Sequence, residues 1–431
     1  MLIFIENTPR AYAWGQADAL SDLLGTPATG QPQAELWLGA HPGHPAAVTQ
    51  ASSSMQTLID LIESDPERYG FDGARVPFLL KVLAIGAPLS LQVHPDSAQA
   101  AAGFAAEEAA GVSPDARERN YGDPHHKPEL LVALSEVSAL SGFRSLSAAR
   151  RDLQAFASVT RGKHAVALAS VAERLSRGEA AAARRDFLDW VFSGDPVVAE
   201  ALDALAAVAT SAAEDPELES HGELDPDRLS VLRTLSETHP GDPGILVSLL
   251  LHFVRLAPGD AIFLQARQLH AYVGGIAVEV MASSDNVLRA GLTEKYVDVP
   301  ELCRIVDTCE LSEPRFPHEP LAPGLVVWRP PVPDFQLMRA RLCEEENERK
   351  SRDRAPAVSV AADHPLVLVV TEGRVRVERQ ADLAEVASVR RGQSLYVSAG
   401  EPISLTGEGE AFIATVGEAL SNNHHIRGEN L

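Results

Sequence analysis

Apolar and polar residues alternate with a period of two in short stretches over the first 145 residues and again after residue 256. This period is typical of half-buried β-strands, because successive side chains of a strand point to opposite faces. Glycine and proline separate the stretches, as expected of turns between strands. The pattern predicts a mainly β protein in which these two parts of the chain form one barrel. One short helix is expected over residues 55–62, where apolar positions follow helical spacing.

Residues 146–255 have a different character, with alanine-rich segments and charged residues at helical intervals. Apolar residues three and four apart predict helices over residues 165–175, 180–192 and 197–209. A further apolar stripe over residues 245–256 predicts one more helix that leads back to the barrel. This part of the chain is therefore predicted to be a helical insert.

A proline-rich connection near residue 316 leads to a third part of the chain, which again has the pattern of strands. Residues 366–378, LVLVVTEGRVRVE, predict a hairpin with Gly373 at its turn. Two charge-rich stretches, residues 213–227 and 344–354, predict exposed loops.

A weak internal repeat relates the third part of the chain to the first. PGDAIFLQARQLHAY and RGQSLYVSAGEPISL share a turn, a strand, a small-residue turn and a strand when Gly259 is set over Gly392. In this alignment Ile403 lies opposite His270. The second copy therefore lacks this histidine of the first and is predicted to be a structural barrel.

Potential metal ligands follow the alternation of two predicted strands. LSLQVH places Gln92 and His94 on the same face. DPHHKPE places His125, Lys127 and Glu129 on one face, with a proline that suggests a strand start or an edge. An amide oxygen, an imidazole and a carboxylate that converge between two strands suit a divalent metal of borderline softness such as zinc.

A further ligand is expected from LAPGDAIFLQARQLHAYVGG. Residues 261–264 predict a buried strand, and the next alternation places His270 and Tyr272 on one face. Residues far apart in sequence converge inside a barrel, because inward side chains of different strands meet there. The predicted ligand set is Gln92, His94, Glu129 and His270.

Other residues of ligand type do not extend this set. Cys303, Cys309 and Cys343 match no zinc spacing, and we expect them to be reduced thiols of a cytoplasmic protein. His41 and His44 lie in HPGHP, where prolines on both sides prevent a helix, and they are expected at the surface.

The charge balance excludes some classes of partner. The chain has 431 residues, enough for two or three domains, and its 37 basic and 60 acidic side chains give a net charge of −23. An acidic surface disfavours binding to nucleic acid or anionic membranes. No secretory signal or membrane-spanning run is predicted. The basic residues inside the candidate segments therefore stand out as a local positive field for an anionic substrate: Lys81, Lys127, Arg289 and Lys295.

Seven segments together resemble the type I phosphomannose isomerases, a family of zinc-dependent cupin enzymes. The segments are NTPRAYAWG, AELWLGAHP, PFLLKVL, LSLQVHP, HHKPE, LHAYVGG and EVMASSDNVLRAGLTEKYVDV. They occur in the order of the family and are distributed over the first 145 residues and residues 256–299. The resemblance is more specific than any single motif.

The resemblance implies a mainly β fold with an α insert. A cupin-type β-barrel (jelly roll) forms the catalytic domain, followed by a helical domain and a second, C-terminal cupin-like barrel. The predicted limits are residues 1–145 with 256–315 for the catalytic barrel, 146–255 for the helical insert and 316–431 for the C-terminal barrel.

The resemblance also implies reversible isomerisation of D-mannose 6-phosphate and D-fructose 6-phosphate, which links glycolysis to mannose and GDP-mannose metabolism. Zinc, one ion per chain, would assist proton transfer between C2 and C1, and the four predicted ligands match those of the family residue by residue. The candidate catalytic residues are Arg289, Lys127, His126, Glu279 and Asp285. The candidate substrate-binding residues are Lys81, Ser90 and Lys295.

Several alternatives stay open from the sequence. It does not identify the base at C2 or the residues that hold the phosphate. Another cupin metalloenzyme, such as an iron oxygenase, and a non-catalytic sugar-phosphate-binding cupin are the rival functions. We expect a small-molecule sugar phosphate as the partner, no nucleic acid or membrane, and a monomer or weak homo-oligomer in the cytoplasm.

Overall fold

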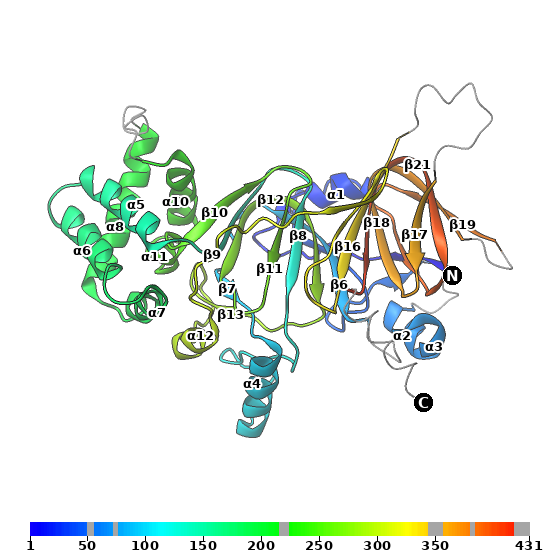
Figure 1. Cartoon of the computed structure of the whole chain (residues 1–431), viewed down its shortest axis with the longest axis horizontal. Helices are drawn as coiled ribbons and strands as arrows, with labels where there is room; N and C mark the ends of the chain where they lie inside the picture. The colour runs from blue at the N-terminus through cyan, green and yellow to red at the C-terminus, as the bar shows by residue number, and fades with distance from the viewer. Residues whose placement is uncertain (50–55, 72–75, 215–223, 344–356, 380–383, 418–431) are drawn as a thin grey trace.

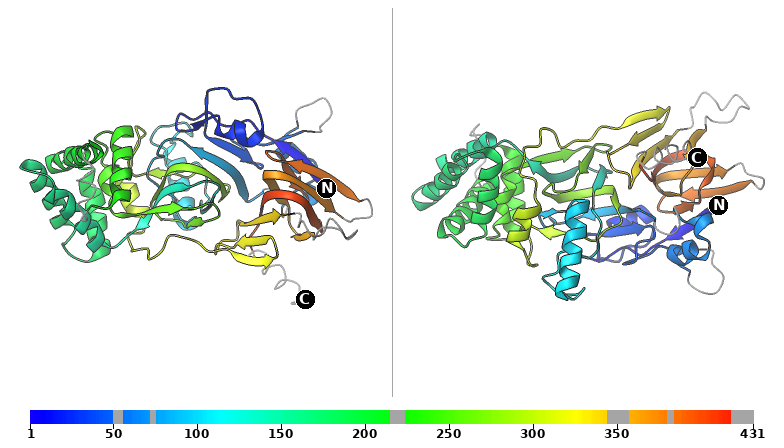
Figure 2. Two further views of the ribbon diagram at one scale, coloured as in Figure 1. Left: turned by 90° about the horizontal axis from the view of Figure 1, so that it is seen from above. Right: turned by 60° about the horizontal axis from the view of Figure 1, so that its bottom comes forward.

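The computed structural model describes the whole chain except residues 50–55, 72–75, 215–223, 344–356, 380–383 and 418–431. The molecule is elongated, with the helices α5 to α11 (residues 146–248) gathered at one end and two groups of strands following along its length (Figure 1). The same order is seen from above and in a tilted view (Figure 2). Of the two predicted charged loops, most of the first and all of the second lie outside the described residues.

We call the strands beside the helices the central β unit. It contains β4 (Glu35–Leu38), β6 (Phe78–Ile85), β7 (Gln92–Val93), β8 (Glu129–Ala133), β9 (Val137–Phe143), β10 (Leu251–Leu256), β11 (Ala261–Leu264), β12 (His270–Ala282) and β13 (Leu288–Arg289). The first half of β12 pairs with β9 and β7, and its second half pairs with β6 and β8. β12 thereby joins two groups of strands, although the pairings among the described residues do not close into a ring.

The C-terminal β unit is a second sheet system. It contains β1 (Leu2–Glu6), β5 (Ala47–Val48), β14 (Glu319–Ala322), β15 (Leu325–Trp328), β16 (Gln336–Leu342), β17 (Val358–Ala362), β18 (Leu366–Arg379), β19 (Glu385–Arg390), β20 (Ser394–Val397) and β21 (Gly400–Thr415). β1 pairs with β20, so the first residues of the chain pack with the last strands. The domain limits predicted from the sequence include β1 in the first barrel, whereas its pairing places it in the C-terminal β unit. The other predicted domain limits stay a prediction.

The predicted hairpin at Gly373 is wrong. β18 continues through this residue as one strand because both of its halves pair with β21. Gly373 lies just beyond an irregularity in that pairing and has a φ of 67°. A Cβ atom there would lie 2.2 Å from the carbonyl oxygen of Glu408, so the close approach of β21 requires glycine.

Strand β6 is buried on both faces, which explains its nearly continuous apolar sequence FLLKVLAI. Phe78, Leu80 and Val82 belong to an apolar core that also contains Trp328 of the C-terminal unit. The alternate residues point the other way, and Lys81 among them faces a cavity of the central unit. The two β units are therefore joined by a shared core, while the opposite face of β6 is left for a site.

The helical insert contains α5 (Leu146–Ser158), α6 (Lys163–Arg174), α7 (Ala180–Val191), α8 (Pro196–Glu214), α10 (Pro226–Thr238) and α11 (Gly244–Ser248). The three helices predicted from spacing are confirmed as α6, α7 and α8. The helix predicted over residues 245–256 is wrong, because α11 ends at Ser248 and β10 follows it. Pairing of β10 with β9 overrides the helical spacing of its apolar residues.

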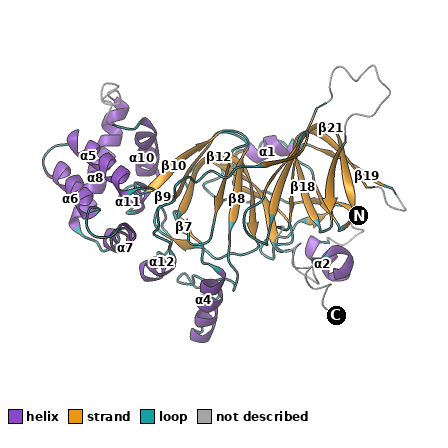
Figure 3. Ribbon diagram, viewed as in Figure 1, coloured by secondary structure: helices purple, strands orange, loops and turns teal. Residues whose placement is uncertain are grey.

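The other helices are α1 (Ala19–Leu24), α2 (Leu58–Ser64), α3 (Pro66–Tyr69), α4 (Ser97–Ala110) and α12 (Val299–Ile305), and β2 (Gln16–Ala17) pairs with β3 (Pro32–Gln33). The short helix predicted near residues 55–62 is confirmed as α2. Strands and helices together confirm a mainly β fold with a helical region (Figure 3). In the part of the chain that the structure describes, no helix combines the length and apolarity needed to cross a membrane.

Candidate metal centre and pocket

A cavity of about 680 Å³ opens into the central β unit. Strands β4, β6, β7, β8, β12 and β13 each contribute lining residues, and the loop of residues 291–295 and the end of α10 complete its wall. Residues from both parts of the predicted catalytic barrel therefore meet here, together with residues of the helical insert.

His94, Glu129 and His270 come together in the interior beside this cavity. Each offers one potential ligand atom, and these atoms all lie within 4.8 Å of one another. The Glu129 oxygens lie 3.3 Å from Nε2 of His94 and 3.5 Å from Nε2 of His270. All three side chains are almost fully buried. The strand arrangement thus brings together three of the four predicted ligands.

The hydrogen bonds of the two imidazoles determine which nitrogen faces Glu129 with a lone pair. Nδ1 of His94 lies 2.6 Å from the carbonyl oxygen of Asn286, and Nδ1 of His270 lies 3.0 Å from that of Gln268. A carbonyl oxygen can only accept, so both Nδ1 atoms donate, and the lone pair of a neutral imidazole in this tautomer lies on Nε2. Both Nε2 atoms are buried without a hydrogen-bond partner. Two lone pairs that face a carboxylate fit a divalent cation between them.

The protonation states also fit a metal ion. Burial, assisted by the charge of Lys127, lowers the pKa of His94 to about 4. Burial by itself raises the pKa of Glu129, but the Lys127 ammonium together with His94 and His270 outweighs it and holds the pKa well below its usual range. Neutral imidazole and ionised carboxylate are the forms that bind metals.

Gln92, the fourth predicted ligand, lies on β7 directly opposite His270 in the strand register. It lines the same cavity as Glu129. Its position is consistent with a ligand, and its role stays a prediction.

The residues before Glu129 only partly follow the predicted alternation. Lys127 is buried, and its Nζ lies 2.9 Å from Glu129 Oε1. His125 is exposed and His126 Nε2 lies 2.8 Å from Asp334; both line a separate cavity of about 230 Å³. The common face predicted for His125 is wrong because β8 begins only at Glu129, so strand alternation does not extend back to it.

A buried network of charges forms another wall of the cavity. Lys81 Nζ lies 3.4 Å from Glu279 and 3.7 Å from Glu35, and Tyr272 donates a 2.9 Å hydrogen bond to Glu279. Burial lowers the pKa of Lys81, but Glu35 and Glu279 outweigh it and raise that pKa. Burial and the charge of Glu129 raise the pKa of Glu279. Burial and the same carboxylates raise the pKa of Tyr272, so Tyr272 stays protonated.

Two cations at the mouth of the cavity have no acidic partner. Within the described part of the chain, the side chains of Arg289 and Lys295 make no hydrogen bond or ion pair. Burial lowers the pKa of Arg289, and burial together with Arg289 lowers that of Lys295. Ser90 lines the same cavity. Unpaired, partly buried cations attract an anion.

Asp285 also lines the cavity, where it is exposed. One of its oxygens lies 3.5 Å from Nε2 of His41. His41 is only 4% exposed and packs edge-on against Trp37, so the expectation that it lies at the surface is wrong. The sequence around HPGHP contains no periodic signal that would have indicated this burial.

The lining residues that were not predicted include four with polar side chains: Tyr12, Glu35, Thr238 and His239. Glu35 and Trp37 alternate on β4, and this pattern was the available signal for Glu35. Thr238 and His239 belong to the helical insert, and no sequence pattern relates them to the distant strands. Only the packing of the insert on the central unit places them here.

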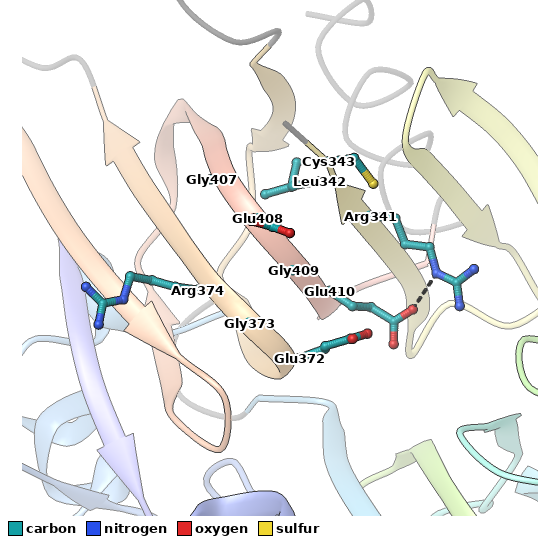
Figure 4. A pocket seen from close by; sticks show the side chains of 10 residues that line it. All are labelled: Arg341, Leu342, Cys343, Glu372, Gly373, Arg374, Gly407, Glu408, Gly409 and Glu410. Carbon is teal, nitrogen blue, oxygen red and sulfur yellow. Dashed lines mark hydrogen bonds and ion pairs between the residues drawn. The ribbon is translucent and has the colours of Figure 1, made fainter. Parts of the chain in front are cut away.

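A second cavity, of about 620 Å³, lies in the C-terminal β unit (Figure 4). Its walls carry Arg341, Arg374, Glu372, Glu408 and Glu410, and Arg341 donates a 2.7 Å hydrogen bond to Glu410. No histidine is among the described residues that line it. The chemistry-bearing group of His94, Glu129 and His270 therefore assigns the site to the central unit.

Sequence comparisons relate this chain to proteins of one kind. A sequence model described as phosphomannose isomerase type I, catalytic domain, matches residues 2–146. The mannose-6-phosphate isomerase of Escherichia coli K12 is 35% identical over 415 residues, which cover 94% of this chain and 96% of that protein. The mannose-6-phosphate isomerase of Homo sapiens is 32% identical over 418 residues, with coverage of 91% and 92%.

Solved structures agree with the sequence relatives. A crystal structure of zinc-bound mannose 6-phosphate isomerase superposes with a TM-score of 0.82 at 32% identity and covers 96% of this chain and 99% of its own. The apo form from Salmonella typhimurium gives a TM-score of 0.81 at the same identity and coverage.

Proposed function

Because the chain belongs to the type I phosphomannose isomerase family, we propose that it interconverts D-mannose 6-phosphate and D-fructose 6-phosphate. The observation that carries the proposal is the pair of buried, unpartnered Nε2 atoms of His94 and His270, which face Glu129 beside a cavity with two unpaired cations. The relatives do not favour another cupin metalloenzyme or a non-catalytic binding protein.

The cofactor is zinc, with His94, Glu129 and His270 as ligands and Gln92 as the proposed fourth. Three of these residues offer nitrogen or oxygen atoms of the kind that zinc prefers. When bound, the ion supplies positive charge that polarises a substrate oxygen. Asn286 and Gln268 orient the two imidazoles through their carbonyl oxygens.

The substrate phosphate is proposed to bind Arg289 and Lys295, with Ser90 nearby. Both cations are unpaired at the cavity mouth, whereas Lys81 is engaged by Glu279 and Glu35. Guanidinium and ammonium groups are the usual partners of phosphate. Lys81 is therefore proposed to hold the buried carboxylates in place and not to grip the phosphate.

Proton transfer between C2 and C1 needs a base and a positive environment for the oxygens that become negative. Glu279 is proposed to exchange the proton, because its raised pKa suits a carboxyl group that both accepts and returns one. Tyr272 and Lys81 hold Glu279 in position. Lys127 supplies positive charge beside Glu129, and Asp285 remains a candidate acid at the mouth. His126 is excluded from this proposed set because its ring is turned to Asp334.

The test measures metal content and formation of fructose 6-phosphate for the parent protein, Glu129→Ala and the control Glu136→Ala. Glu136 is an exposed carboxylate in the turn after β8. We expect one zinc ion and turnover in the parent and the control, and loss of both in Glu129→Ala. A folded parent with metal but no turnover would refute the proposed reaction. Unchanged zinc content in Glu129→Ala would refute the proposed metal site.

We also propose that the protein acts in the cytoplasm as a monomer or weak homo-oligomer. Its three cysteines are free thiols, which is consistent with a reducing compartment. Light scattering at several protein concentrations would test the oligomeric state.

A further inference from the structure

The helical insert reaches the mouth of the cavity. Thr238, the last residue of α10, and His239 line it. The chain then turns, with a 3.1 Å hydrogen bond from the backbone N–H of Asp242 to the carbonyl oxygen of His239. This turn lies against residues 289–295, which we call the rim loop because they carry Arg289 and Lys295.

One carboxylate connects the insert to the rim loop. Asp242 Oδ1 accepts hydrogen bonds from the backbone N–H groups of Gly244, at 2.7 Å, and Leu292, at 2.8 Å. Its Oδ2 accepts from the backbone N–H of Thr293 at 3.1 Å. Charged acceptors make stronger hydrogen bonds than neutral ones. The carboxylate therefore holds backbone of both segments and pairs with neither cation.

The rim loop has a conformation that needs such support. Leu292 has a φ of 54°, in the left-handed region that is unfavourable for a residue with a Cβ atom. Its neighbour Gly291 has a φ of 108°, and a Cβ atom there would lie 2.7 Å from the Cα of Gly244. On the other side, the N–H of Leu91 donates a 3.0 Å hydrogen bond to the carbonyl oxygen of Gly291. The loop is thus fixed between the strand region of the site and the insert.

We propose that Asp242 is a positioning residue for anionic substrate, which it serves by holding the rim loop so that Arg289 and Lys295 face the cavity together. The inference rests on the proposed function, in which these cations bind the sugar phosphate. The two cations repel each other and lack ionic partners, so an untethered loop would separate them. The helical insert thereby contributes to substrate binding through Asp242 without touching the substrate.

The experiment compares the zinc-loaded parent with Asp242→Ala, Asp242→Asn and Asp225→Ala. Asp225 is a matched control, because it also accepts a backbone N–H hydrogen bond in the insert, from Asp227 at the start of α10, far along the chain from the cavity. The measurements are KM and kcat for mannose 6-phosphate, the dissociation constant for inorganic phosphate by calorimetry, and zinc content.

We expect Asp242→Ala to raise KM and the phosphate dissociation constant about tenfold, since misplaced binding groups lose affinity, while kcat and zinc content change less than about twofold. Asp242→Asn should show a smaller increase, because its amide oxygen still accepts from Gly244 and Leu292. Asp225→Ala should match the parent in KM and phosphate affinity.

Unchanged KM and phosphate affinity in Asp242→Ala would overturn the inference, and so would an equal increase in Asp225→Ala. If the parent binds phosphate but has no turnover, the proposed function fails separately. In that case weaker phosphate binding by Asp242→Ala would still support the positioning role, and equal binding would overturn it. Should the alanine variant not fold, parent-like phosphate affinity in Asp242→Asn would count against the inference and weaker affinity would support it.

Discussion

Strand β12 of the central unit and β21 of the C-terminal unit occupy corresponding places in two units of similar construction. Gly259 and Gly392, aligned in the sequence repeat, have φ angles of 95° and 82°. β11 and β20 each begin two residues later, and β12 and β21 follow them. At the aligned position, His270 of β12 faces Glu129, whereas Ile403 of β21 is fully buried in an apolar core.

The two interiors differ in what they bury. The apolar core of the C-terminal unit contains aliphatic side chains and one methionine, and the unit also buries the charged side chains of Arg379 and Glu410 near its edges. The interior of the central unit instead buries a group of lysine, histidine and glutamate side chains: Lys81, His94, Lys127, Glu129, His270 and Glu279. Burying charge costs free energy unless each group has a partner. A unit with a chemical site therefore has less interior for apolar packing.

Apolar cores outside the site compensate for the apolar packing that the interior of the central unit lacks. The outward residues of β6 and β12 share one core with the C-terminal unit, and the insert packs a second core against β7 and β9. Through this shared core the C-terminal unit stabilises the central unit from outside, so the interior of the central unit can hold charged side chains.

The largest effect on turnover is expected from substitution of His270, which the sequence repeat aligns with Ile403. His270→Ala removes one of the proposed metal ligands, and we expect loss of zinc and at least about a thousandfold loss of turnover, because a bound metal contributes several kcal/mol in the transition state. Metal analysis and a coupled isomerase assay measure both. The matched variant Ile403→Ala should keep its zinc. Zinc retained by His270→Ala would show that the two interiors do not differ as described.

Arg289→Ala should have the next largest effect. It removes an unpaired guanidinium from the cavity mouth, and kcat/KM should fall about 10²- to 10³-fold, as for loss of a donor to developing or fixed negative charge. Steady-state kinetics measure the fall. Arg374→Ala, which changes an exposed arginine in the C-terminal cavity, is the control and should keep its activity. Equal kinetics for the two variants would contradict the assignment of the anion site.

Ile403→Ala should affect stability and not chemistry. The residue is fully buried in the C-terminal core, and its truncation should cost about 2–5 kcal/mol of unfolding free energy. Urea unfolding measures the loss, and kcat at a temperature where the variant is folded should stay near that of the parent. A loss of kcat without a loss of stability would mean that the C-terminal interior takes part in the reaction.

The smallest effect on turnover is expected from His126→Ala. Its ring bonds to Asp334 in the loop between β15 and β16 of the C-terminal unit and lines a separate cavity, so kcat should change less than about threefold. A fall of a hundredfold or more would restore the catalytic role that the sequence suggested. His126→Gln, which keeps a donor for Asp334, would then distinguish proton transfer from positioning.

Much of the local structure could be predicted because it depends on the spacing of apolar residues and on the turn residues that separate the segments. β11 has the predicted limits, α6, α7 and α8 lie within two residues of their predicted starts, and Lys81 faces the cavity as expected. Residues 251–256 were predicted as helix, because apolar residues there fit the helical period. Their partner β9 lies more than a hundred residues away, and no local pattern reports it.

By itself, the sequence determined the class of fold and the identity of the candidate ligands, since alternation, turn residues and an ordered set of motifs are local properties of the chain. Tertiary structure alone decided that His94 and His270 present their lone pairs to Glu129, that His126 is turned to Asp334, and that Asp242 holds the rim loop. These features depend on distances between segments that are far apart in the chain. Such distances result from the packing of the β units and the insert, which no single segment encodes.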